Sequence, residues 1–422
     1  MNREYFPDTR IGDWEHVGVM DTKADGLESW GHQSYNTARW LSRLGVAWSI
    51  ALAVQIAPPA FGGPREQAQR IYERIAGVPP SATVLDQMAA KTAAGDLTGA
   101  AAIATDAATF YSVTLKNFVT PWTNRDQTVF APLNDYTATV IGMVRDDVAF
   151  NTVLSADILY TISASGLPAP SAANNDHYAM AETNGVDLKA TLVATTQSTV
   201  YGLPVEATSG IWTTRGGSSA FFIMGTNRAQ FRFTMINHLC HDMETVMDTT
   251  RPTDRIRQDV ARSPGGDGRI FLNNCVGCHS AMDPMAQAFA YYNYDTTGTR
   301  LVYTASMVQP KYLINSQNFS DGFVTPDNSW SNRWRDGPNA ALGWDSTLPG
   351  SGLGAKSLGQ ELAASDAFAQ CQVTKVFQTV CFRAPASTAD QATVGAIKGN
   401  FKAGGYKLKQ VFQQSAAACA GQ

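Results

Sequence analysis

The sequence has little charge, no basic run and no long apolar run. Only 16% of its 422 residues are charged while 44% are hydrophobic, which is enough to form a core and excludes a disordered polymer. The 32 basic and 36 acidic residues give a net charge of −4. This balance excludes nucleic acid as the main partner, because phosphate binding needs concentrated positive charge. Without 18 consecutive apolar residues, multi-span membrane insertion is also excluded.

The first 62 residues have the pattern of a targeting segment rather than of a folded domain. Arg39 and Arg43 precede 14 largely apolar residues, 44–57, and Ala60-Phe61-Gly62 follows. A basic segment, a short apolar segment and a small-x-small site are typical of a secretory signal peptide. As a helix, 14 residues span about 21 Å, less than the ~30 Å hydrocarbon core. We therefore predict an N-terminal extension plus signal peptide over 1–62, with a buried helix or a signal anchor as the alternatives.

The remaining chain predicts a mainly α fold in three parts. Residues 63–228 form a helical domain whose Ser-, Asn- and Gly-rich segment 161–228 is expected to have little regular structure. Residues 229–357 begin with a helix over 230–248 and contain a loop with Trp330, Trp334 and Trp344, which is long enough for a covering or functional role. Residues 358–422 form a three-helix unit. Helices are expected at 65–76, 81–91, 97–105, 107–119, from 134 onward, and at 358–381, 388–401 and 407–418.

The strongest motif is Cys275-Val276-Gly277-Cys278-His279. The spacing C-x-x-C-H is the attachment signature of c-type haem. Two thiols add to the two vinyl groups of the porphyrin, and the next residue places an imidazole on the iron. The motif predicts one covalent haem c, with Cys275 and Cys278 as thioether residues and His279 as the proximal axial ligand.

Three other interpretations of the motif are open: a zinc site, a redox-active dithiol and a disulfide. Zinc would need a second pair of ligands, and only Cys240-His241, 35 residues upstream, offers one. A thioredoxin-like dithiol would need a βαβ setting, which the sequence does not predict. The predicted signal peptide favours haem, because haem c is attached outside the cytoplasm.

The segment around this motif resembles the haem segment of the planctomycete-type cytochrome c domain proteins. The stretch from Glu361 to Phe412 is similar to that family's closing domain. The resemblance covers about 230–422 well and 64–160 more loosely, and it implies a large secreted bacterial cytochrome without an assigned reaction. The matching positions are Cys275, Cys278, His279, Met282-Asp283-Pro284, Phe289, Tyr294-Asp295, Gly298 and Arg300.

The second axial ligand of the iron has several candidates. Met307, 28 residues after His279, is far enough along the chain to reach the opposite face of the haem. His238, at the edge of an apolar helical stripe, is the alternative, and an open site is the third possibility. Met282 and Met285 are tied to the proximal helix, and we expect them to pack in the core.

The other cysteines predict disulfides, because an exported protein folds in an oxidising setting. Cys381 and Cys419 close two predicted C-terminal helices and should pair, which leaves Cys240 with Cys371. The alternative is that Cys240 and Cys371 are buried thiols.

An arginine cluster precedes the haem motif, and Arg255 and Arg257 are candidate contacts of the haem propionates. A solvated surface is the alternative role for these arginines.

These observations favour an exported, periplasmic or extracellular, monohaem c-type cytochrome that carries single electrons to or from a redox protein partner. An electron carrier is favoured over an enzyme. One alternative is a haem enzyme or ligand sensor with an open iron site. The other is a structural, filament-forming subunit, because the chain is much longer than the ~100 residues that a small cytochrome needs and self-assembly would use the excess.

Overall fold

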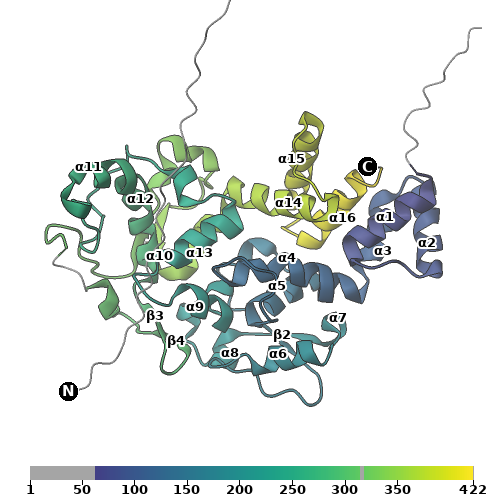
Figure 1. Cartoon of the computed structure of the whole chain (residues 1–422), viewed down its shortest axis with the longest axis horizontal. Helices are drawn as coiled ribbons and strands as arrows, with labels where there is room; N and C mark the ends of the chain where they lie inside the picture. Colours follow the sequence, from purple (N-terminus) through teal and green to yellow (C-terminus); the bar gives the residue numbers. More distant parts are fainter. Residues whose placement is uncertain (1–61, 314–317, 422) are drawn as a thin grey trace, which may run out of the picture. The chain divides into compact units, whose positions relative to one another are not determined.

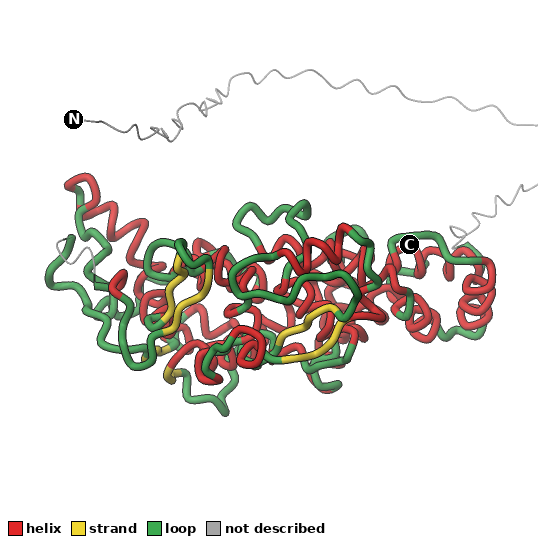
Figure 2. Tube along the Cα trace, turned by 90° about the horizontal axis from the view of Figure 1, so that it is seen from below, coloured by secondary structure: helices red, strands yellow, loops and turns green. Residues whose placement is uncertain are grey.

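The computed structural model describes residues 62–313 and 318–421. Helices dominate this part of the chain, and the strands occur as short antiparallel pairs among them (Figures 1 and 2). The predicted mainly α fold is therefore confirmed. The predicted signal peptide lies outside the described residues. No helix in 62–313 or 318–421 is long and apolar enough to cross a bilayer.

The predicted N-terminal helices are confirmed, and local capping explains where they begin and end. Helix α1 (Pro64–Ala76) stops at Gly77, whose φ of +74° suits glycine. The Ser81 hydroxyl accepts a hydrogen bond from the Val84 N–H at the start of α2 (Ala82–Ala93), and Asp96 caps α3 (Leu97–Thr105) in the same way. The next helical elements are a π-helix (Phe110–Leu115), α4 (Lys116–Val119) and α5 (Asp135–Arg145), which Asn134 caps.

The expectation of little regular structure over 161–228 is wrong. Strand β1 (Leu159–Ile162) pairs with β2 (Leu192–Thr195), and four helices share this segment. These elements are too short to produce a sequence period, and tertiary contacts hold them: the ring Nε2 of His177 accepts a hydrogen bond from the Ile162 N–H at 3.0 Å. The helices are α6 (Asp176–Thr183), α7 (Leu188–Thr191), α8 (Gln197–Tyr201) and α9 (Arg215–Phe221).

The helix predicted over 230–248 is shorter than expected. Helix α10 (Arg228–Thr234) continues as a π-helix (Met235–Leu239), and the helical run ends at Cys240, whose φ is +59°. A left-handed residue cannot continue a right-handed helix, and the sulfur of Cys240 is bonded to Cys371. Beyond Cys240, Met243 and Val246 pack into the core from a separate 3₁₀ turn (Met243–Val246), whereas Met247 is exposed.

The central segment is built around one long helical run. It begins at α11 (Gly268–Ile270), passes through a π-helix (Phe271–Cys275) and ends with α12 (Val276–Ala286). A hairpin of β3 (Tyr292–Asp295) and β4 (Arg300–Tyr303) follows.

The loop beyond β4 contains the pair β5 (Ser329–Ser331) and β6 (Ser351–Leu353). Trp330 and Trp334 are buried, and the partly buried Trp344 packs against the same core. These tryptophans anchor the loop in the core, and its covering or functional role stays a prediction.

The C-terminal part has four helices rather than three, because the helix predicted over 358–381 is two helices. Helix α13 (Gly354–Ala364) ends at Ser365, whose hydroxyl caps α14 (Asp366–Cys381) by accepting from the Phe368 N–H. Helices α15 (Thr388–Ala403) and α16 (Leu408–Ala418) match their predictions closely.

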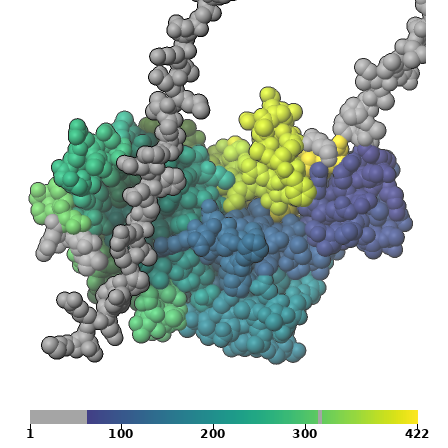
Figure 3. Space-filling model, viewed as in Figure 1, coloured from purple at the N-terminus to yellow at the C-terminus, as the bar shows by residue number. Residues whose placement is uncertain are grey.

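The three predicted parts share one hydrophobic core. Buried side chains from Ala68 to Ala420 form a single cluster. Helices α1 and α3 near the start of the described chain pack against α16 near its end, and Figure 3 shows these purple and yellow segments in contact. The predicted boundaries at 228 and 357 therefore do not separate parts that each have a hydrophobic core of their own.

Candidate haem-attachment site

The Cys275–His279 motif lies on one side of the central helical run. Cys275 is the last residue of the π-helix, while Cys278 and His279 belong to the first turns of α12. Positions i, i+3 and i+4 share one helix face, and these three residues are partly exposed while Val276, Gly277 and Ser280 between and after them are buried. The motif therefore presents its three reactive side chains on the same side of the helix.

Cys275 and Cys278 are the two cysteines without a disulfide partner among the described residues. The Cys278 sulfur lies 3.6 Å from the carbonyl oxygen of Met243, and burial raises the pKa of its thiol. Cys275 packs against a small second cluster that includes Phe271, whereas Cys278 packs against the main core. The two free cysteines therefore contact different apolar clusters, Cys275 the small one and Cys278 the main one.

The other four cysteines pair as the sequence predicts. Cys240 bonds to Cys371 with a Cα–Cα distance of 5.3 Å, and Cys381 bonds to Cys419 with a Cα–Cα distance of 5.8 Å. Both distances are typical of disulfides. The alternative of buried free thiols at Cys240 and Cys371 does not fit this geometry.

His279 is oriented by a carboxylate on its own helix. Its Nδ1 lies 3.1 Å from Oδ1 of Asp283, four residues along α12. An ionised carboxylate only accepts hydrogen bonds, so Nδ1 carries the proton and donates it. In the neutral ring this leaves the lone pair on Nε2, which makes no hydrogen bond to any residue that the structure describes. A carboxylate bonded to the other ring nitrogen is the usual outer partner of a histidine that binds a metal.

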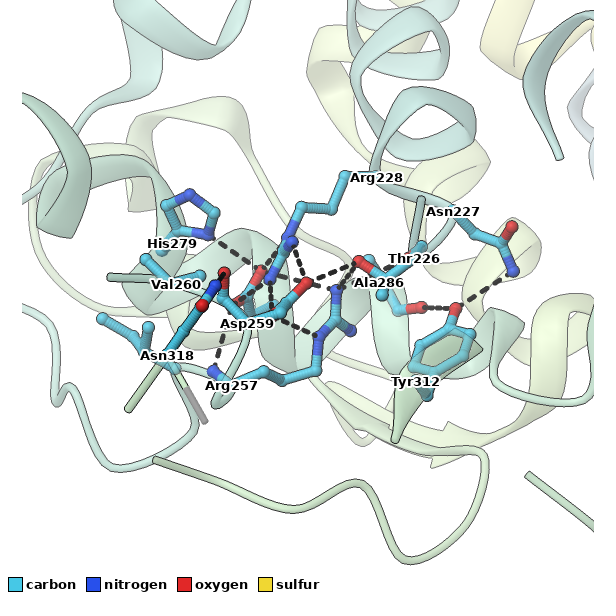
Figure 4. Close-up of polar contacts among 12 residues, drawn as sticks. Thr226, Asn227, Arg228, Arg257, Asp259, Val260, His279, Ala286, Tyr312 and Asn318 are labelled. Carbon is cyan, nitrogen blue, oxygen red and sulfur yellow. Dashed lines mark hydrogen bonds and ion pairs between the residues drawn. The ribbon is translucent and has the colours of Figure 1, made fainter. Parts of the chain in front are cut away.

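Asp283 is the buried centre of a charge cluster, which we call the Asp283 cluster: Arg228, Arg257, Asp259, His279 and Asp283. Arg228 donates to both oxygens of Asp283, at 2.7 and 3.0 Å, and to both oxygens of Asp259, at 2.7 and 2.9 Å. Figure 4 shows His279 at one end of this arrangement and the two guanidinium groups within it. Burial alone would raise the pKa of Asp283, but Arg228 and Arg257 hold it well below its usual range. The carboxylate that orients His279 is therefore ionised.

The arginines predicted to contact haem propionates both have partners within the protein. Arg257 is 2% exposed, donates to the Thr226 hydroxyl at 2.7 Å, and places its guanidinium 4.9 Å from the ring centre of Tyr312. Arg255 donates to the Gln287 side chain at 2.6 Å and lies over the Phe323 ring. Arg257 therefore belongs to the Asp283 cluster, and a propionate contact by either arginine stays a prediction.

The two candidate distal ligands lie in different environments. Met307 is 58% exposed in a turn after β4, where its N–H donates to the Thr304 carbonyl. His238 is 1% exposed, and its Nε2 lies 3.1 Å from the Tyr136 hydroxyl. The ring of His238 packs edge-on against Trp122 and parallel to Phe368, and burial lowers its pKa. Across 62–313 and 318–421, no hydrogen bond or ring contact joins Met307 or His238 to the Cys275–His279 motif.

Met282 and Met285 are buried in the main core, as expected for residues on the proximal helix. Asp283 lies between them and was not singled out as a functional residue from the sequence. The spacing of His279 and Asp283 does predict their contact, because a carboxylate four residues after a histidine lies beside it on a helix.

The donor set fits a covalently attached haem. Two free thiols and one imidazole with an available Nε2 lie on one helix face, and the exposed apolar side chains of Ile270 and Leu272 precede them on the same helical run. Within the described ranges, no group of three or more His, Cys, Asp or Glu side chains is placed to hold a metal ion. A porphyrin-held iron does not require such a group, because the protein supplies only axial ligands.

Comparisons of this chain with protein-family models, curated proteins and solved structures found no significant match.

Proposed function

We propose that this protein is an exported monohaem c-type cytochrome of the kind that its haem segment resembles. Cys275 and Cys278 would hold the haem through thioether bonds, and His279 would bind the iron through Nε2. One observation carries the proposal: four of the six cysteines are paired, and the two left over belong to the C-x-x-C-H motif, whose histidine has its Nε2 free.

Export is the second part of the proposal. Two disulfides are typical of a protein that folds in an oxidising compartment, and haem c is attached in such compartments. The basic and apolar residues before Gly62 supply the signal in the sequence. We therefore place the protein in the periplasm or outside the cell.

Electron transfer is the favoured activity, with a redox protein as partner. Bound haem supplies an iron that changes its charge by one unit reversibly. The protein's own contribution is to orient His279 through Asp283 and to keep that carboxylate charged with Arg228 and Arg257. A ligand histidine bonded to a carboxylate donates more electron density, which favours the oxidised iron and a lower potential.

The direct test is haem staining after denaturing electrophoresis of the full chain, produced in a bacterial host that attaches haem c. Wild type should keep its stain after acid-acetone extraction, because thioether bonds survive it. C275A/C278A should lose the stain, while C381S/C419S, which removes two cysteines elsewhere, should keep it. A wild-type protein whose haem is extracted would refute covalent attachment.

An open iron site, as in a haem enzyme or ligand sensor, is the second candidate function. Two observations favour it: Met307 is more than half exposed, and the His238 Nε2 is already bonded to Tyr136. Carbon monoxide added to the reduced protein distinguishes the candidates by its shift of the Soret band. A shift in wild type indicates the open site. Its absence in wild type, together with its appearance in M307A, would assign Met307 as the distal ligand, and its appearance in H238A would assign His238.

A further inference from the structure

The outer edge of strand β4 has no neighbouring strand and faces a pocket. The pocket has a volume of about 290 Å³, at the lower end of the range of ligand sites in proteins. Its walls are β4, the segment 201–204 at the end of α8, and the start of α9, which packs beside β4 (Figure 1). All four residues of β4 line it, although successive side chains of a strand point to opposite faces. The pocket therefore opens onto the edge of the strand.

The register of the β3–β4 hairpin shows which backbone groups of β4 are free. The Thr304 N–H donates to the Tyr291 carbonyl at 3.0 Å, so these two residues form a hydrogen-bonded pair. Hydrogen-bonded and non-hydrogen-bonded pairs alternate along an antiparallel ladder, so the N–H and C=O groups of Leu301 and Tyr303 point away from β3. No residue in 62–313 or 318–421 forms a hydrogen bond with these groups. They are therefore available to an added strand.

Two arginines line the same pocket without a carboxylate partner. Arg215 donates from Nη2 to the Asn175 side chain at 3.0 Å, while its Nε is buried and has no hydrogen-bond partner in the described chain. Arg300 is exposed, and its guanidinium makes no ion pair or hydrogen bond with a described residue. No acidic side chain is among the described residues that line the pocket. The strand edge and two guanidinium groups with free N–H donors therefore meet in one place.

The acidic residues near these arginines bind other donors. Asp135 is fully buried, and its carboxylate accepts from the Tyr201 hydroxyl at 2.8 Å and from backbone N–H groups at the start of α9. Asp295 lies opposite Arg300 in the hairpin register, but its carboxylate accepts from the Thr297 N–H at 2.9 Å. Neither carboxylate forms an ion pair with a guanidinium of the pocket, so a ligand can supply that partner.

From this arrangement we infer that the pocket binds the C-terminal end of an extended peptide. The peptide backbone would pair with Leu301 and Tyr303 as a third strand of the hairpin, and the terminal carboxylate would pair with Arg215 and Arg300. Strand addition supplies main-chain hydrogen bonds, and a guanidinium binds a carboxylate through two parallel N–H groups. The small volume of the pocket suits a chain end rather than a chain that continues. None of these residues belongs to the Cys275–His279 motif or to the Asp283 cluster, so the inference is independent of haem.

The test is fluorescence anisotropy of the full-length protein with the peptide Gly-Thr-Val-Thr-Val, labelled with fluorescein at its N-terminus, and with the C-terminal amide of the same peptide. The proposed contacts involve the backbone and the carboxylate, so the probe needs only β-branched residues that favour an extended chain. Wild type should bind the acid about ten- to a hundredfold more tightly than the amide, because the acid forms charge-assisted hydrogen bonds. R215M should weaken binding of the acid by a similar factor and remove the preference over the amide.

A second pair of probes tests the strand pairing. Each is the free acid with a methyl group on one of two successive amide nitrogens. Alternate N–H groups of a paired strand face its neighbour, so one methyl group should weaken binding about tenfold and the other should leave it unchanged.

The matched control is R65M, since Arg65 pairs with Asp86 outside the pocket. This variant should bind the acid like wild type, and thermal unfolding should confirm that each variant is folded. No binding of the acid, equal affinities of wild type for the acid and the amide, unchanged binding by R215M, or equal effects of the two methyl groups would overturn the inference. The comparison of the four peptides on wild type decides the question even if R215M does not fold.

Discussion

Replacing Asp283 by asparagine should lower the free energy of unfolding by about 3–5 kcal/mol, the usual effect of removing one partner from a buried ion pair. The wild-type carboxylate is fully buried and accepts from Arg228 through both oxygens and from His279. An asparagine side chain keeps one oxygen but turns the other position into an NH₂ group. That group would face N–H donors of Arg228 or of the Arg257 backbone, whose nitrogen lies 3.3 Å from Oδ2.

Urea unfolding followed by circular dichroism, with the disulfides intact, measures this change. D267N is the matched control, because Asp267 pairs with Arg269 at the surface, where the arginine side chain is 84% exposed, and its unfolding midpoint should stay close to that of wild type. In the double variant R228M/D283N, the two effects should be less than additive by about 1–3 kcal/mol, since both residues belong to one cluster. If D283N is as stable as D267N, the carboxylate is not the centre of the cluster and our account of how His279 is oriented is wrong.

Two further perturbations test other parts of the structure. Burial lowers the pKa of Lys311 to about 7, so between pH 7 and about 10.4 the unfolded state binds more protons and wild type should gain stability as pH rises, by at most about 1.4 kcal/mol per pH unit. K311M should lack this gain in urea titrations across that range, and parallel pH profiles for the two proteins would contradict the buried amine. Removing the Cys240–Cys371 disulfide as C240S/C371S should cost about 5 kcal/mol for its separation of 131 residues, and C381S/C419S about 4 kcal/mol for 38. Thermal unfolding orders the two variants, and a larger loss for C381S/C419S would refute the loop-length argument.

Local chemistry made much of the fold predictable. The side chains of Ser81 and Asn134 accept hydrogen bonds from free N–H groups at the start of a helix. Both residues cap a helix at the position where the sequence predicts its start. Ser365 carries the same capping signal, but the apolar pattern continues across it and predicts one uninterrupted helix over 358–381. Cys240 carries no such signal: it is neither glycine nor proline, yet its backbone is left-handed, and its disulfide partner, Cys371, is 131 residues away.

In the candidate site, too, the features that depend on local contacts can be predicted from the sequence, whereas those that depend on distant residues cannot. The spacing of Cys275, Cys278 and His279 depends on one helix and follows from the sequence. Asp283 is also local to that helix, but its ionisation depends on Arg228, 55 residues earlier, and no sequence period connects the two. The short elements within 161–228 give no sequence signal for the same reason, because tertiary contacts rather than propensity hold them.

The two disulfides turn much of this chain into covalent rings. The larger ring runs from Cys240 to Cys371 and contains both the Cys275–His279 motif and the Trp-rich loop, while the smaller one closes at Cys419. A protease that cuts once inside either ring therefore releases no fragment. A nick in the exposed parts of the Trp-rich loop leaves one covalent molecule, heavier only by the water of hydrolysis, until its disulfides are reduced. In an environment rich in proteases, the motif and its surroundings would thus stay attached to the C-terminal helices after a first cut.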